Sequence, residues 1–113
     1  MKILITGDYC PIGRTINYLE NEDYSNLFNG FEKIIENVDY SIVNFECPIT
    51  TSTTQIDKTG PCLKTEDLNS IKALKYAGFH LLTLANNHIQ DYGGKGVLDT
   101  INTIKNEGID YVG

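Results

Sequence analysis

The chain has 113 residues, of which 41% are apolar and 21% charged, a composition typical of a folded domain rather than a disordered segment. Its formal net charge is −6, from 9 basic and 15 acidic side chains, and the basic residues are scattered along the chain. This charge disfavours nucleic-acid partners, and no apolar run is long enough to cross a bilayer, so we expect neither nucleic-acid binding nor direct membrane insertion.

The first half of the chain predicts two strands and one helix. Residues 2–7 are apolar and β-branched and end at a Gly-Asp pair, as a buried strand would, and residues 41–46 form a second such run before Pro48. Between them, apolar residues recur at helical spacing behind a candidate Asn29 cap: Phe31, Ile34, Ile35 and Val38. The stretch from Pro48 to Pro61 is rich in Thr, Pro and Gly, which predicts a long functional or mobile loop.

The second half predicts two more helices and two more strands. Thr65 is a candidate cap for a helix that ends at Gly78, with Leu68, Ile71 and Leu74 along one face. Residues 79–85 read as a third strand. A third helix, ending at Gly108, is indicated by Val97, Leu98, Ile101 and Ile104, and residues 109–112 begin a fourth strand.

This alternation of strands and helices predicts an α/β fold. Successive βαβ units joined by right-handed crossovers give a mostly parallel sheet, which we expect to be covered by helices on both faces. In such sheets, binding sites lie at the carboxyl ends of the strands.

Polar side chains follow three of the predicted strands, at the point where each strand ends. They are Asp8, then Glu46, then Asn86, Asn87 and His88 followed by Asp91. Carboxylate and amide oxygens and imidazole nitrogen are ligands that borderline divalent metals accept, and a bound metal can make hydroxide at neutral pH. The pattern therefore predicts a metal site for hydrolytic chemistry, with manganese, zinc or iron as the ion.

Each of these residues also has a structural explanation. Asp8 could cap a turn, Glu46 could pair with a lysine, and Asn86 and Asn87 could satisfy a tight turn. Three coincident strand ends favour a site over three separate coincidences. Because His88 follows a strand rather than lying within one, we expect its replacement to affect turnover more than folding.

Other polar residues are weaker candidates. Arg14 and Lys58, together with Asn86, could bind an anionic substrate, although a solvated side chain is the simpler explanation of either basic residue. His80 lies within an apolar strand and is given no role. The cysteines are Cys10, Cys47 and Cys62, an odd number without C-x-x-C spacing, which indicates packed, reduced thiols and a cytoplasmic location.

Five segments carry a family resemblance: Gly7 to Arg14, Asn44 to Thr50, Lys58 to Pro61, Leu84 to Gly93 and Gly108 to Gly113. Their most specific part is Asn-x-Glu-x-Pro followed by Ala-Asn-Asn-His-x-x-Asp-x-Gly. In this order they resemble the motifs of the bacterial CapA family, the capsule and poly-γ-glutamate synthesis proteins, over the whole chain.

The resemblance implies a domain similar to the calcineurin-like metallophosphoesterases. On that analogy Asp8 would ligate one metal ion, Glu46 would bridge two, Asn87 would ligate the second, and His88, with Asp91, would carry the catalytic role. Three positions depart from the phosphoesterase pattern. Cys10 stands in place of a histidine ligand, Glu46 in place of an aspartate, and Asn86 in place of a glycine.

The domain implied by the resemblance is longer than this chain, so residues 1–113 are expected to be its N-terminal part and to bind metal weakly alone. The expected function is metal-dependent hydrolysis of a phosphoester or amide-type bond in capsule polymer synthesis. Expected partners are an anionic polymer or small phosphate-containing substrate and capsule-synthesis subunits, with membrane association through other regions as an alternative to the cytoplasm. The alternative function is a non-catalytic binding component of a polymer-synthesis assembly.

Overall fold

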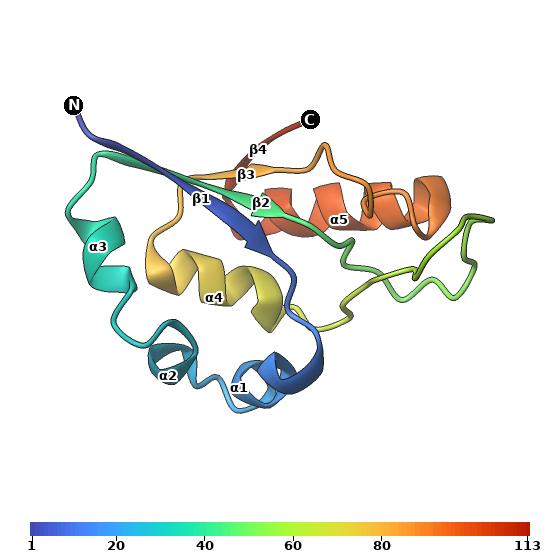
Figure 1. Ribbon diagram of the computed structural model, residues 1–113, viewed down its shortest axis with the longest axis horizontal. Coiled ribbons are helices and arrows are strands. Elements are labelled where there is room, and N and C mark those ends of the chain that lie inside the picture. The colour runs from blue at the N-terminus through green and yellow to red at the C-terminus, as the bar shows by residue number, and fades with distance from the viewer.

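Four parallel strands form one sheet in the order β1-β2-β3-β4 in the computed structural model, which describes residues 1–113 (Figure 1). The strands are β1 (Ile3–Tyr9), β2 (Tyr40–Phe45), β3 (Leu81–Thr83) and β4 (Asp110–Val112). The helices are η1 (Gly13–Thr15), α1 (Ile16–Glu20), α2 (Tyr24–Phe28), α3 (Glu32–Glu36), α4 (Asn69–Ala77) and α5 (Gly93–Glu107). The predicted α/β fold with alternating βαβ units is confirmed.

The helices cover only one face of the sheet, so the prediction that both faces are covered is wrong. Each new strand adds to the same side of the previous one, and right-handed crossovers that all step in one direction place their helices on one face. Figure 1 shows α1, α2, α3 and α4 below the strands, with no helix above them. The other face is open, and Ile5 there is 74% exposed.

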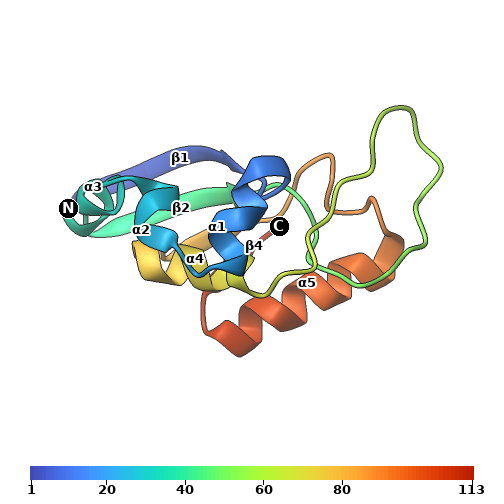
Figure 2. The ribbon, with the colours of Figure 1, turned by 90° about the horizontal axis from the view of Figure 1, so that it is seen from below.

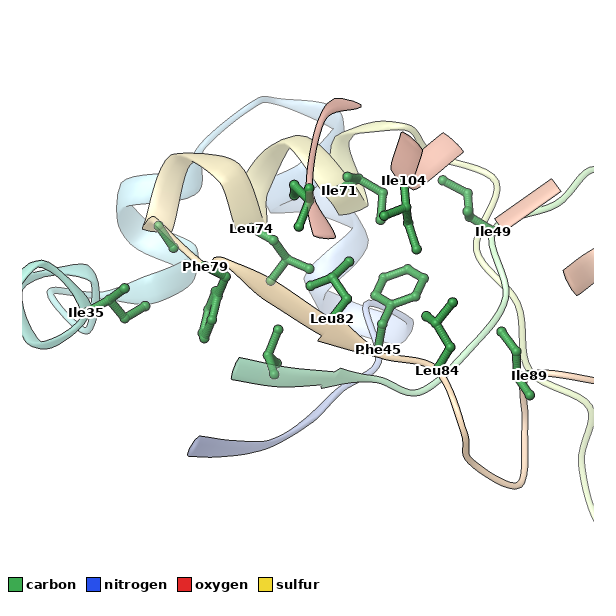
Figure 3. Close-up of a cluster of buried hydrophobic side chains, with 13 residues drawn as sticks. Ile35, Phe45, Ile49, Ile71, Leu74, Phe79, Leu82, Leu84, Ile89 and Ile104 are labelled. Atoms are coloured by element: carbon green, nitrogen blue, oxygen red, sulfur yellow. The ribbon is translucent and has the colours of Figure 1, made fainter. Parts of the chain in front are cut away.

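The core lies between the covered face of the sheet and the helices. Phe45 and Leu82, from adjacent strands, contact α4 and α5 residues in one cluster of 13 buried apolar side chains (Figure 3). From α4 the cluster takes Ile71 and Leu74, and from α5 it takes Ile104. Burying each such side chain stabilises the fold by about 1.5–3 kcal/mol, so this cluster fixes the strands whose ends carry the site.

Three local predictions for the helices are wrong. Asn29 does not cap α3; it is the left-handed residue that ends α2, with φ of 50°. Thr65 does not cap α4, because it forms an isolated parallel bridge with Ile49 and the helix begins at Asn69. Leu98 does not face the core but is exposed. The helices α1 and α2 were not predicted, since each has five residues and too few turns to show a period.

Both predicted helix-ending glycines are confirmed. Gly78 and Gly108 end α4 and α5 in the left-handed conformation, with φ of 97° and 74°. The predicted long loop is also present: residues 51–64, here called the 51–64 loop, contain no helix or strand. Its ends are joined where the Thr50 N–H donates to the Thr65 carbonyl oxygen. No helix has the length and apolar character that a bilayer-spanning segment requires.

Candidate functional site

A bulge in β1 brings Asp8 to the carboxyl edge of the sheet. Ile5 pairs with Ile42, but Asp8 pairs with Asn44, so β1 contains one residue more than β2 over this stretch. Without the extra residue Asp8 would align with Phe45, which points into the core. The bulge therefore turns the Asp8 carboxylate toward the open face, where it is exposed.

Four polar side chains from the first three strands form one hydrogen-bonded row at this edge, here called the edge network: Asp8, Asn44, Thr83 and Asn86. Asn44 Nδ2 donates to Asp8 Oδ1 at 2.7 Å, and the Thr83 hydroxyl donates to Asn44 Oδ1 at 3.0 Å. Asn86 Nδ2 donates to the Phe45 carbonyl oxygen at 2.8 Å and to Asn44 Oδ1 at 3.3 Å. The register aligns Asp8, Asn44 and Thr83 on one face, which is why their side chains meet.

Asn44 and Thr83 were not among the predicted site residues. Each is a polar residue near the end of a mostly apolar strand, and residues two positions apart in a strand point to the same face. A search for polar residues that share a face near the ends of neighbouring strands would have found them. Only the register shows that they contact Asp8.

Asn86 shapes the turn after β3. Its Oδ1 accepts hydrogen bonds from the backbone N–H groups of His88 and Ile89, both at 3.0 Å. The structural explanation for this residue therefore holds, and the turn it makes carries Asn87 to an exposed position and His88 to a buried one.

Asp91 is the centre of a second cluster, which it forms with His88 and Lys58. The Asp91 side chain is fully buried, and its Oδ2 is 2.7 Å from His88 Nδ1. Its Oδ1 accepts a hydrogen bond from Lys58 Nζ at 2.6 Å, and Oδ2 also accepts one from the Leu63 N–H at 2.7 Å. Burial alone would raise the pKa of Asp91, but the hydrogen bonds from Lys58, Leu63 and His88 outweigh burial and hold the pKa below its ordinary value.

His88 has one nitrogen engaged and one free. The residue is only 9% exposed. Nε2 has no hydrogen-bond partner within the chain. It is also not a fully buried atom, because the only fully buried side-chain polar atom without a partner is Glu32 Oε2. His88 is one of the residues that line a pocket, with Ile56, Lys58, Thr59, Pro61 and Asn87.

The remaining predicted residues lie apart from these contacts. Glu46 is half-buried just after β2, where its backbone N–H donates to the Tyr9 carbonyl oxygen at 3.0 Å, and its side chain has no ion pair. Arg14 is exposed in η1 and is also without an ion pair. Lys58, by contrast, forms an ion pair with Asp91 and also donates a hydrogen bond to the Asn87 carbonyl oxygen at 3.3 Å.

The thiols of Cys10 and Cys47 lie beside one another near Asp8 and Glu46. Burial is the main factor that raises the pKa of each thiol, and the neighbouring carboxylate of Glu46 raises both further. Such thiols stay protonated near neutral pH, so they are poor nucleophiles. All three cysteines are free.

The residues of this chain do not by themselves fit a metal centre. No three histidine, cysteine or acidic side chains are close enough together to hold an ion. Asp8 already receives an N–H donor from Asn44, and His88 Nδ1 is turned to Asp91. A complete metal site at this edge would need ligands from outside residues 1–113.

Comparison with known proteins places this chain in a class, the bacterial capsule synthesis proteins. The model of the family described as bacterial capsule synthesis protein PGA_cap matches residues 2–113. The chain belongs to this family.

Similar relatives carry related names. The chain is 38% identical, over its whole length, to the capsule biosynthesis protein CapA of Bacillus anthracis, and covers 28% of that protein. It is 32% identical over 83% of its length to the PGA biosynthesis protein CapA of Bacillus subtilis (strain 168), of which it covers 25%. A probable polyglutamine synthesis accessory protein of Mycobacterium tuberculosis is 34% identical over 71% of the chain. The chain thus spans about a quarter of the length of these relatives.

Proposed function

We propose that this chain forms part of the active site of a hydrolase that acts in poly-γ-glutamate capsule synthesis, on a phosphoester or amide-type bond. The observation that carries the proposal is the paired His88 and Asp91. A buried carboxylate holds one imidazole nitrogen, the other nitrogen has no partner within the chain, and His88 lines a pocket at the carboxyl edge of the sheet. This is the arrangement in which a histidine serves as general acid or base.

The roles of the other residues follow from their positions. Asn87 lines the pocket beside His88, so it is close enough to contact a substrate bound there. Asn86 shapes the turn that presents His88 and lines a second pocket, of which Asn87 is also part. Arg14, which has no ion pair, is the better candidate to bind an anionic polymer or phosphate group, because Lys58 is neutralised by Asp91.

A divalent metal, whether manganese, zinc or iron, remains part of the proposal for a longer protein only. Asp8, Glu46 and Asn87 would contribute to its site, and further ligands would come from outside residues 1–113. This chain alone should bind metal weakly, because affinity depends on the number of preformed ligands.

The test compares the segment in a chain of the relatives' full length with its His88→Gln variant, on phosphomonoester, phosphodiester and γ-glutamyl amide substrates with each metal added. General acid–base assistance is worth about 10²–10⁴ in rate, and His88→Gln should lose that factor. His80→Gln is the matched control and should retain activity. Equal activity of His88→Gln and the parent protein would contradict the proposal.

A second candidate function is a non-catalytic component of the capsule-synthesis assembly. The open face of the sheet favours it, since Ile3, Ile5 and Val112 leave a partly apolar surface there. An inactive full-length protein that still associates with polymer or with capsule-synthesis subunits would support this second function instead.

A further inference from the structure

The 51–64 loop makes more hydrogen bonds to Asp91 than to any other residue of the segment after β3. The Asp91 carboxylate accepts hydrogen bonds from Lys58 Nζ and the Leu63 N–H, and the Asp91 carbonyl oxygen accepts one from the Ile56 N–H at 2.9 Å. Figures 1 and 2 both show the long yellow-green segment projecting beyond the sheet beside the orange segment that follows β3. One buried residue therefore ties three points of the loop to the segment that carries His88.

Lys58, together with the Leu63 N–H, favours the form of Asp91 that only accepts hydrogen bonds. A carboxylate that is ionised accepts hydrogen bonds only, whereas a protonated one can also donate. An ammonium group 2.6 Å away stabilises the ionised form at a fully buried position, where an unpaired charge would be costly. The Asp91 oxygen facing His88 must then be an acceptor, so His88 Nδ1 must carry the hydrogen.

We propose that Lys58 is a positioning residue for His88: by holding Asp91 as an acceptor, it fixes the imidazole in the Nδ1–H form and leaves Nε2 as the free nitrogen. The use of Nε2 in catalysis rests on the proposed function, but the effect of Lys58 on the tautomer of His88 does not. It extends the site to the 51–64 loop, because a loop that moves away would take the Lys58 ammonium with it.

The other histidine of the chain provides an internal reference. His80 Nδ1 accepts a hydrogen bond from the Ser41 backbone N–H at 3.1 Å, and a backbone N–H can only donate. His80 must therefore be in the Nε2–H form, opposite to that expected for His88. Because the chain has two histidines, a sample with ¹⁵N-labelled imidazoles should give one signal set of each kind.

The experiment is a long-range ¹H–¹⁵N correlation spectrum of the 113-residue chain, recorded at mildly alkaline pH so that neutral imidazole is observed. The parent chain should show His88 in the Nδ1–H form and His80 in the Nε2–H form. Lys58→Met should leave His80 unchanged and give His88 a mixture of both forms. Lys58→Arg, which keeps the charge, should restore a single Nδ1–H form.

Lys64→Met is the matched control. Lys64 lies at the end of the same loop and bonds to the Ser52 carbonyl oxygen and Glu66, without contacting Asp91. It should leave the His88 signal unchanged. The proposal is overturned if Lys58→Met keeps a pure Nδ1–H form, or if Lys64→Met disturbs His88 equally.

The parent spectrum tests the proposal even if Lys58→Met does not fold. An Nε2–H form of His88 in the parent chain would by itself exclude the arrangement. These outcomes are independent of activity, so failure of the positioning role can be told apart from failure of the proposed hydrolase function.

Discussion

Asp8 and Asp91 are two aspartates at the same edge of one sheet, and their surroundings differ in almost every respect. Asp91 is fully buried and its carboxylate contacts Lys58, His88 and the Leu63 N–H. Asp8 is exposed and accepts one side-chain hydrogen bond, from Asn44. A carboxylate whose acceptor sites are filled holds structure together, while one with open lone pairs remains available to a ligand.

The largest effect should come from Asp91→Ala. The change leaves the Leu63 N–H unpaired and removes the counter-charge of Lys58, and breaking a buried ion pair costs about 3–5 kcal/mol. Since Lys58 is 20% exposed and can turn toward water, we expect the lower end of that range. Urea unfolding of the parent and variant chains measures the difference. A loss below about 1 kcal/mol would mean that the carboxylate does not anchor the loop.

Acid should weaken the same contacts. The pKa of Asp91 is lower in the folded chain than in the unfolded chain, so the unfolded chain binds the proton more readily. The stabilisation is therefore complete above the ordinary carboxyl pKa of about 3.9 and is lost as pH falls through the lower folded pKa. Unfolding free energies measured from neutral to acid pH should fall less steeply for Asp91→Asn than for the parent chain.

Asp99 is the matched control for the acid experiment. Hydrogen bonds from Lys95 and Thr50 lower its pKa, but it is not fully buried and does not touch the 51–64 loop. Asp99→Asn should also reduce the fall in unfolding free energy at acid pH. At neutral pH its 51–64 loop should stay protected from hydrogen exchange, and in acid the loop should lose that protection as it does in the parent chain.

His88→Ala should have a smaller effect than Asp91→Ala. It removes one hydrogen bond to a charged group, worth about 1.5–3 kcal/mol, while Asp91 keeps Lys58 and Leu63. The sequence-based expectation that His88 matters little to folding is revised by its burial. His80→Gln, at an exposed residue stacked on Tyr40, is the comparison and should cost less, because its amide oxygen can still accept a hydrogen bond from the Ser41 N–H. Equal losses in thermal or urea unfolding would contradict this order.

The sheet was predictable because its signals are local. Short apolar runs ending at Gly-Asp or Pro, and glycines after amphipathic segments, indicate strands and helix ends within a few residues. The strand order is not local. It depends on which side of β2 the chain adds β3, and this choice put all the helices on one face and left Ile5 exposed.

The strand-end positions of the candidate site residues were predictable, but their contacts were not. Asp8, His88 and Asp91 follow strand ends and are recognisable in the sequence. The contact of Asn44 with Asp8 depends on a one-residue bulge, and that of Lys58 with Asp91 depends on the path of an irregular loop 33 residues away in sequence. Neither a bulge nor a loop path leaves a periodic pattern.

Asp8→Asn should have the smallest effect on the fold and the largest effect on any ligand at the edge. The side chain is exposed, and a surface substitution of this kind changes stability by within about 0.5 kcal/mol. The amide of the variant can still meet Asn44, so the edge network should persist in the spectrum of the chain. In a protein of the relatives' full length, the lost charge should weaken manganese binding at least about tenfold, measured by calorimetry.

Asp23→Asn, at a half-buried residue in the turn before α2, is the control and should leave manganese binding unchanged. A large loss of stability in Asp8→Asn would make Asp8 a structural residue like Asp91, and unchanged manganese affinity would remove it from the proposed metal site.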